Sequence, residues 1–132
     1  MKLNKSLNII FVYYINMKNY YKNKNSFDKR IQESTDIIKK YIDRKPIIVQ
    51  KYEKSDMPDI DKCKFLVPNE LSMTQFMFII RKRIKLEPSQ SLFLTINGSL
   101  VPSNRCISDI YEELKDEDGF LYVTYTNENT FG

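Results

Sequence analysis

The chain has 132 residues, a length typical of one domain, and its 42% apolar and 13% aromatic residues are enough for a hydrophobic core. A net charge of +4 could indicate binding to nucleic acid or to an anionic membrane. So small an excess of positive charge is more typical of an ordinary, mildly basic protein surface. The sequence has no histidine, which removes the usual zinc ligand and general base. Cys63 and Cys106 lack a CxxC spacing. We therefore expect reduced thiols, no metal and no cofactor.

Residues 1–16 contain an apolar stretch from Leu7 to Ile15. It is too short to span a bilayer, which needs about 20 residues. Lys2 and Lys5 precede it as in a signal peptide, but no small-residue cleavage site follows. One interpretation is an interfacial membrane anchor. The interpretation that we prefer is an N-terminal extension ahead of a native start at Met17.

Residues 17–25 are rich in Asn, Lys and Tyr. This composition leaves little to bury and predicts a solvated arm. Contact with a membrane surface is the alternative for its basic and aromatic side chains, which are Lys18, Tyr20, Tyr21, Lys22 and Lys24.

A helix is expected to begin at Phe27, with Ser26 as its N-cap. It should end by Arg44 or Lys45, because Pro46 disfavours helical geometry in the residue before it. Residues at helical spacing along it predict one stripe that faces the core. The stripe consists of Ile31, Thr35, Ile38 and Ile42.

Two short strands follow this helix. The first, residues 47–52, is marked by β-branched residues, and both of its faces begin apolar. This pattern indicates that a helix or a ligand covers the outer face. The second strand, residues 64–67, stops at Pro68 and is short enough to be the edge of a sheet. Alternation places Phe65 and Val67 on one of its faces, and Lys64 and Leu66 on the other.

Ser72 and Gln75 match a capping box that opens a second helix, with Phe76, Ile80 and Ile84 on its apolar face. The basic triplet at residues 81–83 lies in the last turns, where positive charge complements the helix dipole. A nucleic-acid patch is the alternative interpretation of this triplet, and the acidic run at residues 109–118 argues against it.

The rest of the domain is predicted to contain a strand at residues 92–96, a hairpin turn at Asn97-Gly98, a short helix at 108–114 and a last strand at 120–125. Periodicity alone supports an α+β domain. The seven residues that follow, 126–132, would reach roughly 23–25 Å if extended. Because glycine has no Cβ, Gly132 could enter a narrow active-site channel of another protein.

Five blocks of the sequence occur between Phe27 and Gly132 in the order found in one known family. They are residues 53–62, 65–68, 75–84, 115–125 and 128–132. They resemble the ubiquitin-like autophagy modifiers of the light-chain-3/GABARAP family. The resemblance implies an α+β, ubiquitin-like β-grasp fold with an N-terminal helical extension. It also divides the chain into an extension (1–16), a ubiquitin-like domain with N-terminal helices (17–125) and a flexible conjugation tail (126–132).

The resemblance implies that Gly132 is activated with ATP, passed to enzyme cysteines as a thioester and joined to the amine of phosphatidylethanolamine. The activating and conjugating enzymes supply the catalytic residues, so the chain is expected to be their substrate and not an enzyme. A deconjugating cysteine protease is a further implied partner, and nucleic acid is not one. The implied location is the cytoplasm and the autophagosomal membrane, with a vacuolar or plastid membrane as alternatives.

The resemblance also implies that the sheet edge binds cargo receptors through short peptides with an aromatic residue, two spacers and an aliphatic residue. The implied aromatic pocket comprises Glu33, Ile37, Pro46, Ile48, Lys64, Leu66 and Phe120. The implied aliphatic pocket comprises Phe65, Val67, Pro68, Leu71, Phe76 and Ile79, with Arg83 nearby. Arg44, Lys62 and Lys64 would attract acidic residues of the peptide.

Four positions depart from the family pattern. Lys45 stands where an aliphatic residue is usual, and Thr74 where glycine is common. Cys63 replaces a common basic residue and weakens the positive patch. Thr95 replaces an aromatic residue and puts in doubt a second surface that some helical partners use. A peptide-binding adaptor that is never conjugated is the alternative function.

Overall fold

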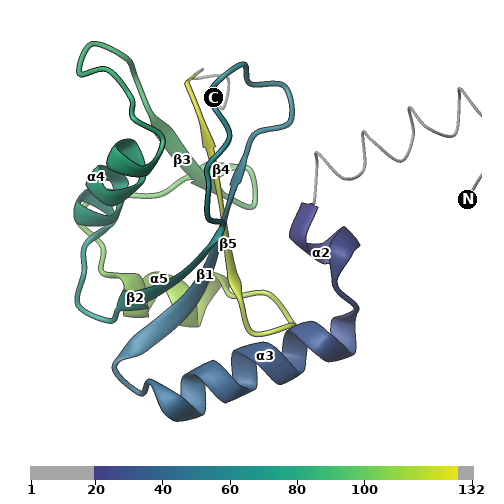
Figure 1. Cartoon of the computed structure of the whole chain (residues 1–132). Helices are drawn as coiled ribbons and strands as arrows, with labels where there is room; N and C mark the ends of the chain where they lie inside the picture. The colour runs from purple at the N-terminus through teal and green to yellow at the C-terminus, as the bar shows by residue number, and fades with distance from the viewer. Residues whose placement is uncertain (1–19, 128–132) are drawn as a thin grey trace, which may run out of the picture.

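The computed structural model describes residues 20–127 and consists of a mixed sheet with helices on both faces (Figure 1). The order of elements confirms the α+β class and the N-terminal helical region. In chain order they are α2 (Tyr20–Lys24), α3 (Phe27–Lys40), β1 (Arg44–Lys51), β2 (Lys64–Pro68), α4 (Met73–Arg83), β3 (Phe93–Ile96), β4 (Ser99–Leu100), α5 (Ile107–Leu114) and β5 (Leu121–Thr126).

The five strands lie in the order β2-β1-β5-β3-β4. β1 and β5 run parallel in the middle, and every other neighbouring pair is antiparallel. The Asn97-Gly98 turn joins β3 to β4, with φ values of 53° and 80° at its two residues, as predicted for a tight hairpin. This order leaves β2 at one edge of the sheet, where the sequence placed it.

The main hydrophobic core lies between the sheet and the helices α4 and α5. Ile47 and Val49 of β1 contribute to it from the sheet, and Phe65 and Val67 contribute from β2. The apolar face predicted for α4 is confirmed, because Phe76, Ile80 and Ile84 are all buried, and the capping box of Ser72 and Gln75 is present. From α5 the core receives Ile107, Ile110 and Tyr111.

A second, smaller hydrophobic cluster lies on the opposite face of the sheet, under α2 and α3. It contains Tyr21, Ile48 and Phe120, with Ile37 packed at its margin. The expectation that both faces of β1 are covered is therefore confirmed. The prediction of a solvated arm is wrong for residues 20–24, which form α2, because the 6%-exposed ring of Tyr21 anchors this helix to the domain. Residues 1–19 lie outside the described part of the chain.

The helix α3 begins with Ser26 as its N-cap, as predicted, but of the stripe expected to face the core only Ile38 packs against it. The side chains of α3 that are buried belong to Arg30 and Ser34, whereas Ile31 is 36% exposed and Ile42, beyond the helix, is 81% exposed. The reason is that polar contacts set the orientation of α3. The Arg30 guanidinium pairs with Asp118 at 2.6 Å, and the Ser34 hydroxyl donates to the Asp118 carbonyl at 2.5 Å.

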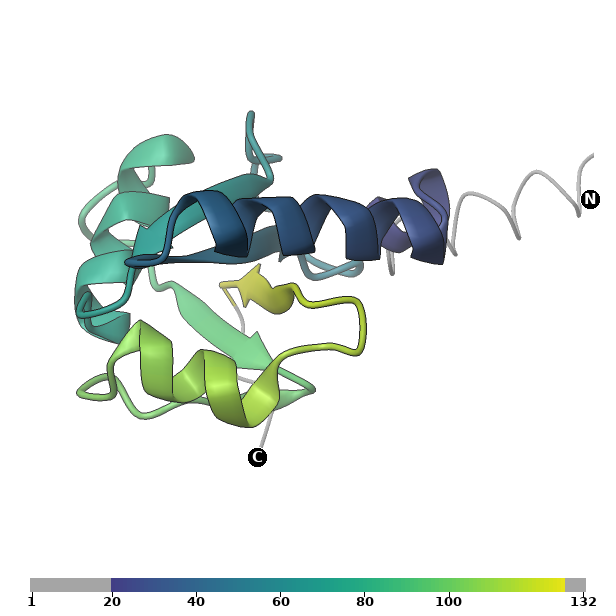
Figure 2. The same ribbon diagram turned by 90° about the horizontal axis from the view of Figure 1, so that it is seen from below.

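Gly119 allows α3 to approach the turn that precedes β5. Its φ of +88° lies in the left-handed region, and a Cβ built there would lie 2.3 Å from Ser34 Oγ. Tyr111 of α5 donates a hydrogen bond to the Gly119 carbonyl at 2.6 Å. The turn is thus held by α3 on one side and α5 on the other (Figure 2).

Candidate functional site: the open edge of β2

The open edge of the sheet presents main-chain groups of β2. Val49 N donates to Cys63 O at 2.7 Å, so Phe65 and Val67 make the hydrogen-bonded pairs with β1. By alternation, the main-chain groups of Lys64 and Leu66 face away from β1. A peptide in extended conformation can pair with these groups as an added strand. Arg44 Nη1 already donates to Leu66 O at 3.1 Å, and this contact has to be shared or displaced.

The residues expected for the aromatic pocket share the sheet face under α3. Leu66 lies opposite Pro46, and Lys64 lies opposite Ile48, in the register of β1 and β2. Ile48 and Phe120 are fully buried and form the floor. The Tyr21 ring covers Phe120 edge-on, with a centroid distance of 5.4 Å. The structure therefore brings the expected residues together on one face of the sheet, where the Tyr21 ring packs against Phe120.

A network of polar contacts joins α2, α3 and β2 above this floor. Tyr21 donates a hydrogen bond from its hydroxyl to Glu33, and Glu33 also forms an ion pair with Lys64. Burial alone would raise the pKa of Glu33, but the hydrogen bonds from Lys64 and Tyr21 outweigh it and hold this pKa below its usual value. Burial, followed by the charge of Glu33, raises the pKa of Tyr21. Tyr21 and Lys64 thus both keep Glu33 ionised.

The residues expected for the aliphatic pocket lie between β2 and α4. The rings of Phe65 and Phe76 pack edge to face, with centroids 5.9 Å apart, and both belong to the main core. Leu71 packs at the margin of the core, while Pro68 and Ile79 are exposed. The set is therefore divided: Phe65, Val67 and Phe76 are structural, and Leu71, Pro68 and Ile79 offer the surface that a ligand can reach.

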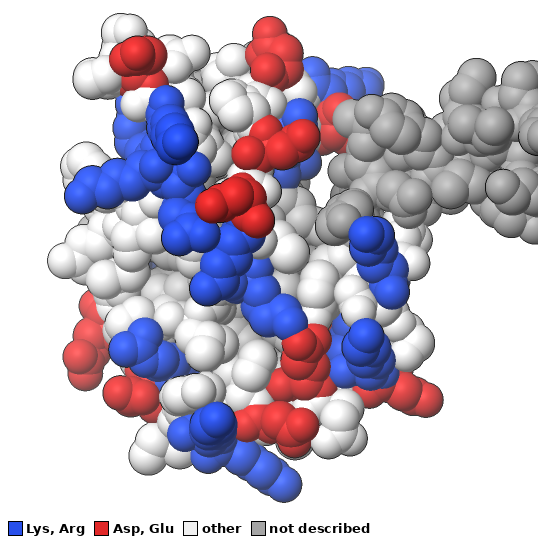
Figure 3. All heavy atoms as spheres, in the orientation of Figure 1, with Lys and Arg blue, Asp and Glu red and all other residues white. Residues whose placement is uncertain are grey.

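Basic side chains form a band across the face shown in Figure 3, with acidic groups among them. Lys62 and Arg83 both lie 5.9 Å from the centroid of the Phe65 ring, and Arg83 also pairs with Asp61. Arg44 donates a hydrogen bond to the Leu66 carbonyl. Together with Lys62 and Arg83, it places positive charge beside the open edge of β2. Arg81 donates instead to the carbonyls of Glu87 and Gln90, so two of the three residues of the basic triplet already have protein partners.

Three residues near the site were not predicted as parts of it. Tyr21 and Tyr122 both pack around Phe120, and Cys63 lies at the margin of the same cluster. Tyr122 donates to Asp118 Oδ2 at 2.5 Å, and burial followed by this hydrogen bond raises its pKa. Alternation along β5 could have found Tyr122, which follows Phe120 by two residues. No periodicity identifies Tyr21, because the residues around it are polar.

Gly132, the expected conjugation site, lies outside the described residues, which end at Asn127. Within residues 20–127, no helix is both long and apolar enough to cross a bilayer. In the same range, no group of three or more Cys, Asp or Glu side chains is arranged to hold a metal ion.

The mixed sheet, with β1 and β5 paired in its centre and α4 packed across it, defines the class of ubiquitin-like proteins. Comparison with known families agrees: a family model described as "Autophagy protein Atg8 ubiquitin like" matches residues 29–132. The chain belongs to this Atg8 family.

Relatives named for autophagy align over most of the chain. Autophagy-related protein 8 of Scheffersomyces stipitis is 52% identical over 116 residues, which cover 88% of this chain and 84% of the relative. Autophagy-related protein 8e of Arabidopsis thaliana is 49% identical over 118 residues, which cover 89% of this chain and 97% of the relative. Among solved structures, the crystal structure of Trypanosoma brucei ATG8 matches with a TM-score of 0.79 and 43% identity, covering 85% of this chain and 97% of that one.

Proposed function

We propose that this chain is a ubiquitin-like modifier that is conjugated through Gly132 to phosphatidylethanolamine, and that its β2 edge binds aromatic-x-x-aliphatic peptides. In this role it is a substrate of activating, conjugating and deconjugating enzymes and is not itself an enzyme. On the autophagosomal membrane it recruits cargo receptors and autophagy factors. A vacuolar or plastid membrane is the alternative destination.

The open edge of β2 carries the peptide-binding part of the proposal. It combines outward main-chain groups at Lys64 and Leu66 with apolar residues on either face of the strand. Main-chain pairing gives an added strand its affinity, and pockets that read alternate side chains give it specificity. Membership of the Atg8 family supports the conjugation part. Two acyl chains on one lipid give firm anchoring, because each buried methylene contributes about 0.8 kcal/mol.

A conjugation reaction tests the covalent part of the proposal. The purified chain is incubated with the family's activating and conjugating enzymes, ATP and liposomes that contain phosphatidylethanolamine, and intact mass is measured. We expect the mass of one lipid to be added to the native chain and not to the Gly132→Ala variant. If neither chain gains mass while a control modifier reacts, the chain is an unconjugated adaptor.

Peptide titration tests the recognition part. An aromatic-x-x-aliphatic peptide is titrated against the native chain and against Leu66→Ala, and Ile42→Ala serves as the control because Ile42 is 81% exposed and lies outside the pocket residues. We expect affinity to fall about 10-fold or more for Leu66→Ala, which corresponds to about 1.4 kcal/mol. Equal affinities for the two variants would remove β2 as the binding edge.

A further inference from the structure

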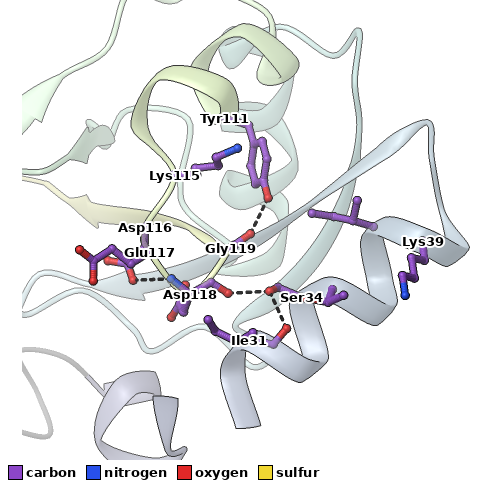
Figure 4. Close-up of a pocket in the computed structure, with 11 residues that line it drawn as sticks. Ile31, Ser34, Lys39, Tyr111, Lys115, Asp116, Glu117, Asp118 and Gly119 are labelled. Carbon is purple, nitrogen blue, oxygen red and sulfur yellow. Dashed lines mark hydrogen bonds between the residues drawn. The ribbon is translucent and has the colours of Figure 1, made fainter. Parts of the chain in front are cut away.

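A second surface of the domain lies between α3 and α5, and the α3 residues that line it are different from Glu33 and Ile37 of the expected peptide pocket. It is a groove of about 600 Å³, within the range of about 300–1,000 Å³ of ligand sites. Ile31 and Ser34 border it from α3, Tyr111 from α5, and the turn at residues 116–119 closes one end (Figure 4). Lys39 and Lys115 also line it.

The groove is bordered by apolar residues of α3 that the core covers only in part: Ile38 packs against the main core, whereas Ile31 is exposed. Ile31 and Ile38 both line the groove, and Phe27 lies one turn before Ile31 on the same face of α3. Phe27 and Ile31 are 44% and 36% exposed. A helical stripe of large apolar side chains normally packs against another element. Within residues 20–127, Phe27 and Ile31 keep part of their apolar surface exposed, which a further apolar segment can bury.

We propose that, in the chain that starts at Met1, this groove is an intramolecular docking site for the apolar segment at residues 7–15. Eight of the nine side chains in this segment are aliphatic or aromatic, and the ninth belongs to Asn8. The segment, like the stripe on α3, consists mainly of apolar side chains. Contact between the two would remove apolar surface of both from water.

The connection between the segment and the groove has sufficient length. Lys22 of α2 forms an ion pair with Asp116 at 2.6 Å, and Asp116 lines the groove, so the chain already lies at one end of it. Ile15 lies five residues before Tyr20, a distance of about 17 Å if the chain is extended. Leu7 lies thirteen residues before Tyr20, a distance of about 45 Å if extended. The groove extends along α3 from Ile31 to Lys39, about 12 Å at 1.5 Å per residue.

Because the segment and the groove belong to the same chain, even a weak contact is enough to keep the segment in the groove. A short connection gives an effective concentration in the millimolar range, so a segment with a dissociation constant of about 0.1 mM would occupy the groove for most of the time.

Methyl NMR of the full chain, labelled at the isoleucine δ1 methyl groups, tests the proposal. The native chain is compared with a variant that carries Ile10→Ser and Phe11→Ser. We expect the methyl signals of Ile31 and Ile38 to shift between the two chains, and the signal of Ile42, outside the groove, to stay unchanged. In the native chain we expect nuclear Overhauser contacts from the Phe11 ring to the Ile31 methyl groups.

The reverse substitution gives an independent measurement. Ile31→Ser should remove the contacts between Phe11 and Ile38, and the control Ile42→Ser should leave them in place. The proposal is overturned if Ile31 and Ile38 shift no more than Ile42. It is also overturned if the shifts grow with protein concentration, which would indicate a second copy as the occupant. Shifts seen only with anionic vesicles would overturn it too, because residues 7–15 would then be a membrane anchor.

Discussion

At the scale of single residues, the ion pair of Arg30 and Asp118 holds α3 against the turn before β5. The Asp118 side chain is fully buried and also accepts hydrogen bonds from Phe120 N at 2.9 Å and the Tyr122 hydroxyl at 2.5 Å. Removal of one partner of a buried pair leaves an uncompensated charge in a site of low polarity. The contacts of Asp118 therefore matter more for stability than those of an exposed carboxylate.

We expect Arg30→Met to destabilise the domain by about 3–5 kcal/mol, because Met fills the space of Arg30 but leaves the Asp118 carboxylate without its cation. Urea unfolding followed by far-ultraviolet circular dichroism measures this change. The matched control is Arg105→Met, whose partner Glu113 has a side chain that is 57% exposed. The control should lose at most about 1 kcal/mol. Equal losses in the two variants would contradict the role given to Asp118.

The close approach of Gly119 to Ser34 gives a second prediction at this scale. Gly119→Ala should destabilise the domain by about 1–3 kcal/mol, since it places a Cβ against Ser34 and holds a non-glycine residue at positive φ. Ser34→Gly by itself should also destabilise the domain, because it removes the hydroxyl that donates to Asp118. The loss in the double variant should nevertheless be smaller than the sum of the two single losses, since the clash is then absent. A double-mutant cycle of unfolding free energies measures the coupling. Purely additive losses would show that the clash does not contribute.

At the scale of elements, α2 is attached to the domain by charged contacts in addition to the Tyr21 ring. Glu33 accepts from Tyr21, and Lys22 pairs with Asp116 at the other side of the helix. Burial would raise the pKa of Asp116, but the hydrogen bond from Lys22 and the contacts made by Asp118 lower it below its ordinary value. Both carboxylates that hold α2 therefore prefer their ionised form in the folded state.

The lowered pKa values of Glu33 and Asp116 predict that acid weakens the attachment of α2. The stabilisation is complete above the ordinary values of 4.5 and 3.8 and is lost as the pH falls through the lower values of the folded state. We expect a Glu33→Gln, Asp116→Asn variant to be less stable than the native chain at pH 6. The difference should shrink as the pH falls below about 4. Chemical denaturation across this range measures it, and a constant difference would contradict the linkage.

The elements also show what the sequence could and could not predict. Capping residues and alternation located α3, β1, β2 and α4 because these signals are local. The orientation of α3 was predicted correctly only for Ile38, which packs against the main core. The most buried side chains of α3 belong instead to Arg30 and Ser34, because they contact a turn 84 to 88 positions away. Tyr21 was missed for the same reason. Its partners Glu33 and Phe120 are distant in sequence, and the composition around it indicates only a polar arm.

Alternation nevertheless separated the two sides of the candidate site. It placed Lys64 and Leu66 on one face of β2 and Phe65 and Val67 on the other. In the structure Phe65 and Val67 belong to the main core, and Lys64 pairs with Glu33 of α3. The pocket residues outside β2 came from the family resemblance, since no spacing rule relates Glu33 or Phe120 to β2. The resemblance could not show that Lys45, a departure from the family, lies 5.6 Å from the centroid of the Tyr111 ring.

At the scale of the whole molecule, basic side chains flank the β2 edge: Arg44 donates to the Leu66 carbonyl, and Lys62 lies over the Phe65 ring. Glu33 partly neutralises Lys64, and Asp61 partly neutralises Arg83. Arg44 and Lys62 are therefore expected to contribute most of the field that an approaching peptide meets. Charges at the rim of a binding site mainly accelerate association, and salt screens them over a distance of about 10 Å at 0.1 M.

We expect an aromatic-x-x-aliphatic peptide with acidic residues before its aromatic residue to associate about 10-fold more slowly at 0.5 M than at 0.05 M salt, with little change in dissociation rate. Stopped-flow measurements at both salt concentrations provide the rates. A peptide of the same core with neutral flanking residues is the control, and its association rate should barely change. In an Arg44→Gln, Lys62→Gln variant the acidic peptide should behave like the neutral one, since the steering charges are then absent. If salt instead changes the dissociation rate of the acidic peptide, its acidic residues form lasting ion pairs in the complex, and charge at this edge contributes to affinity more than to the speed of encounter.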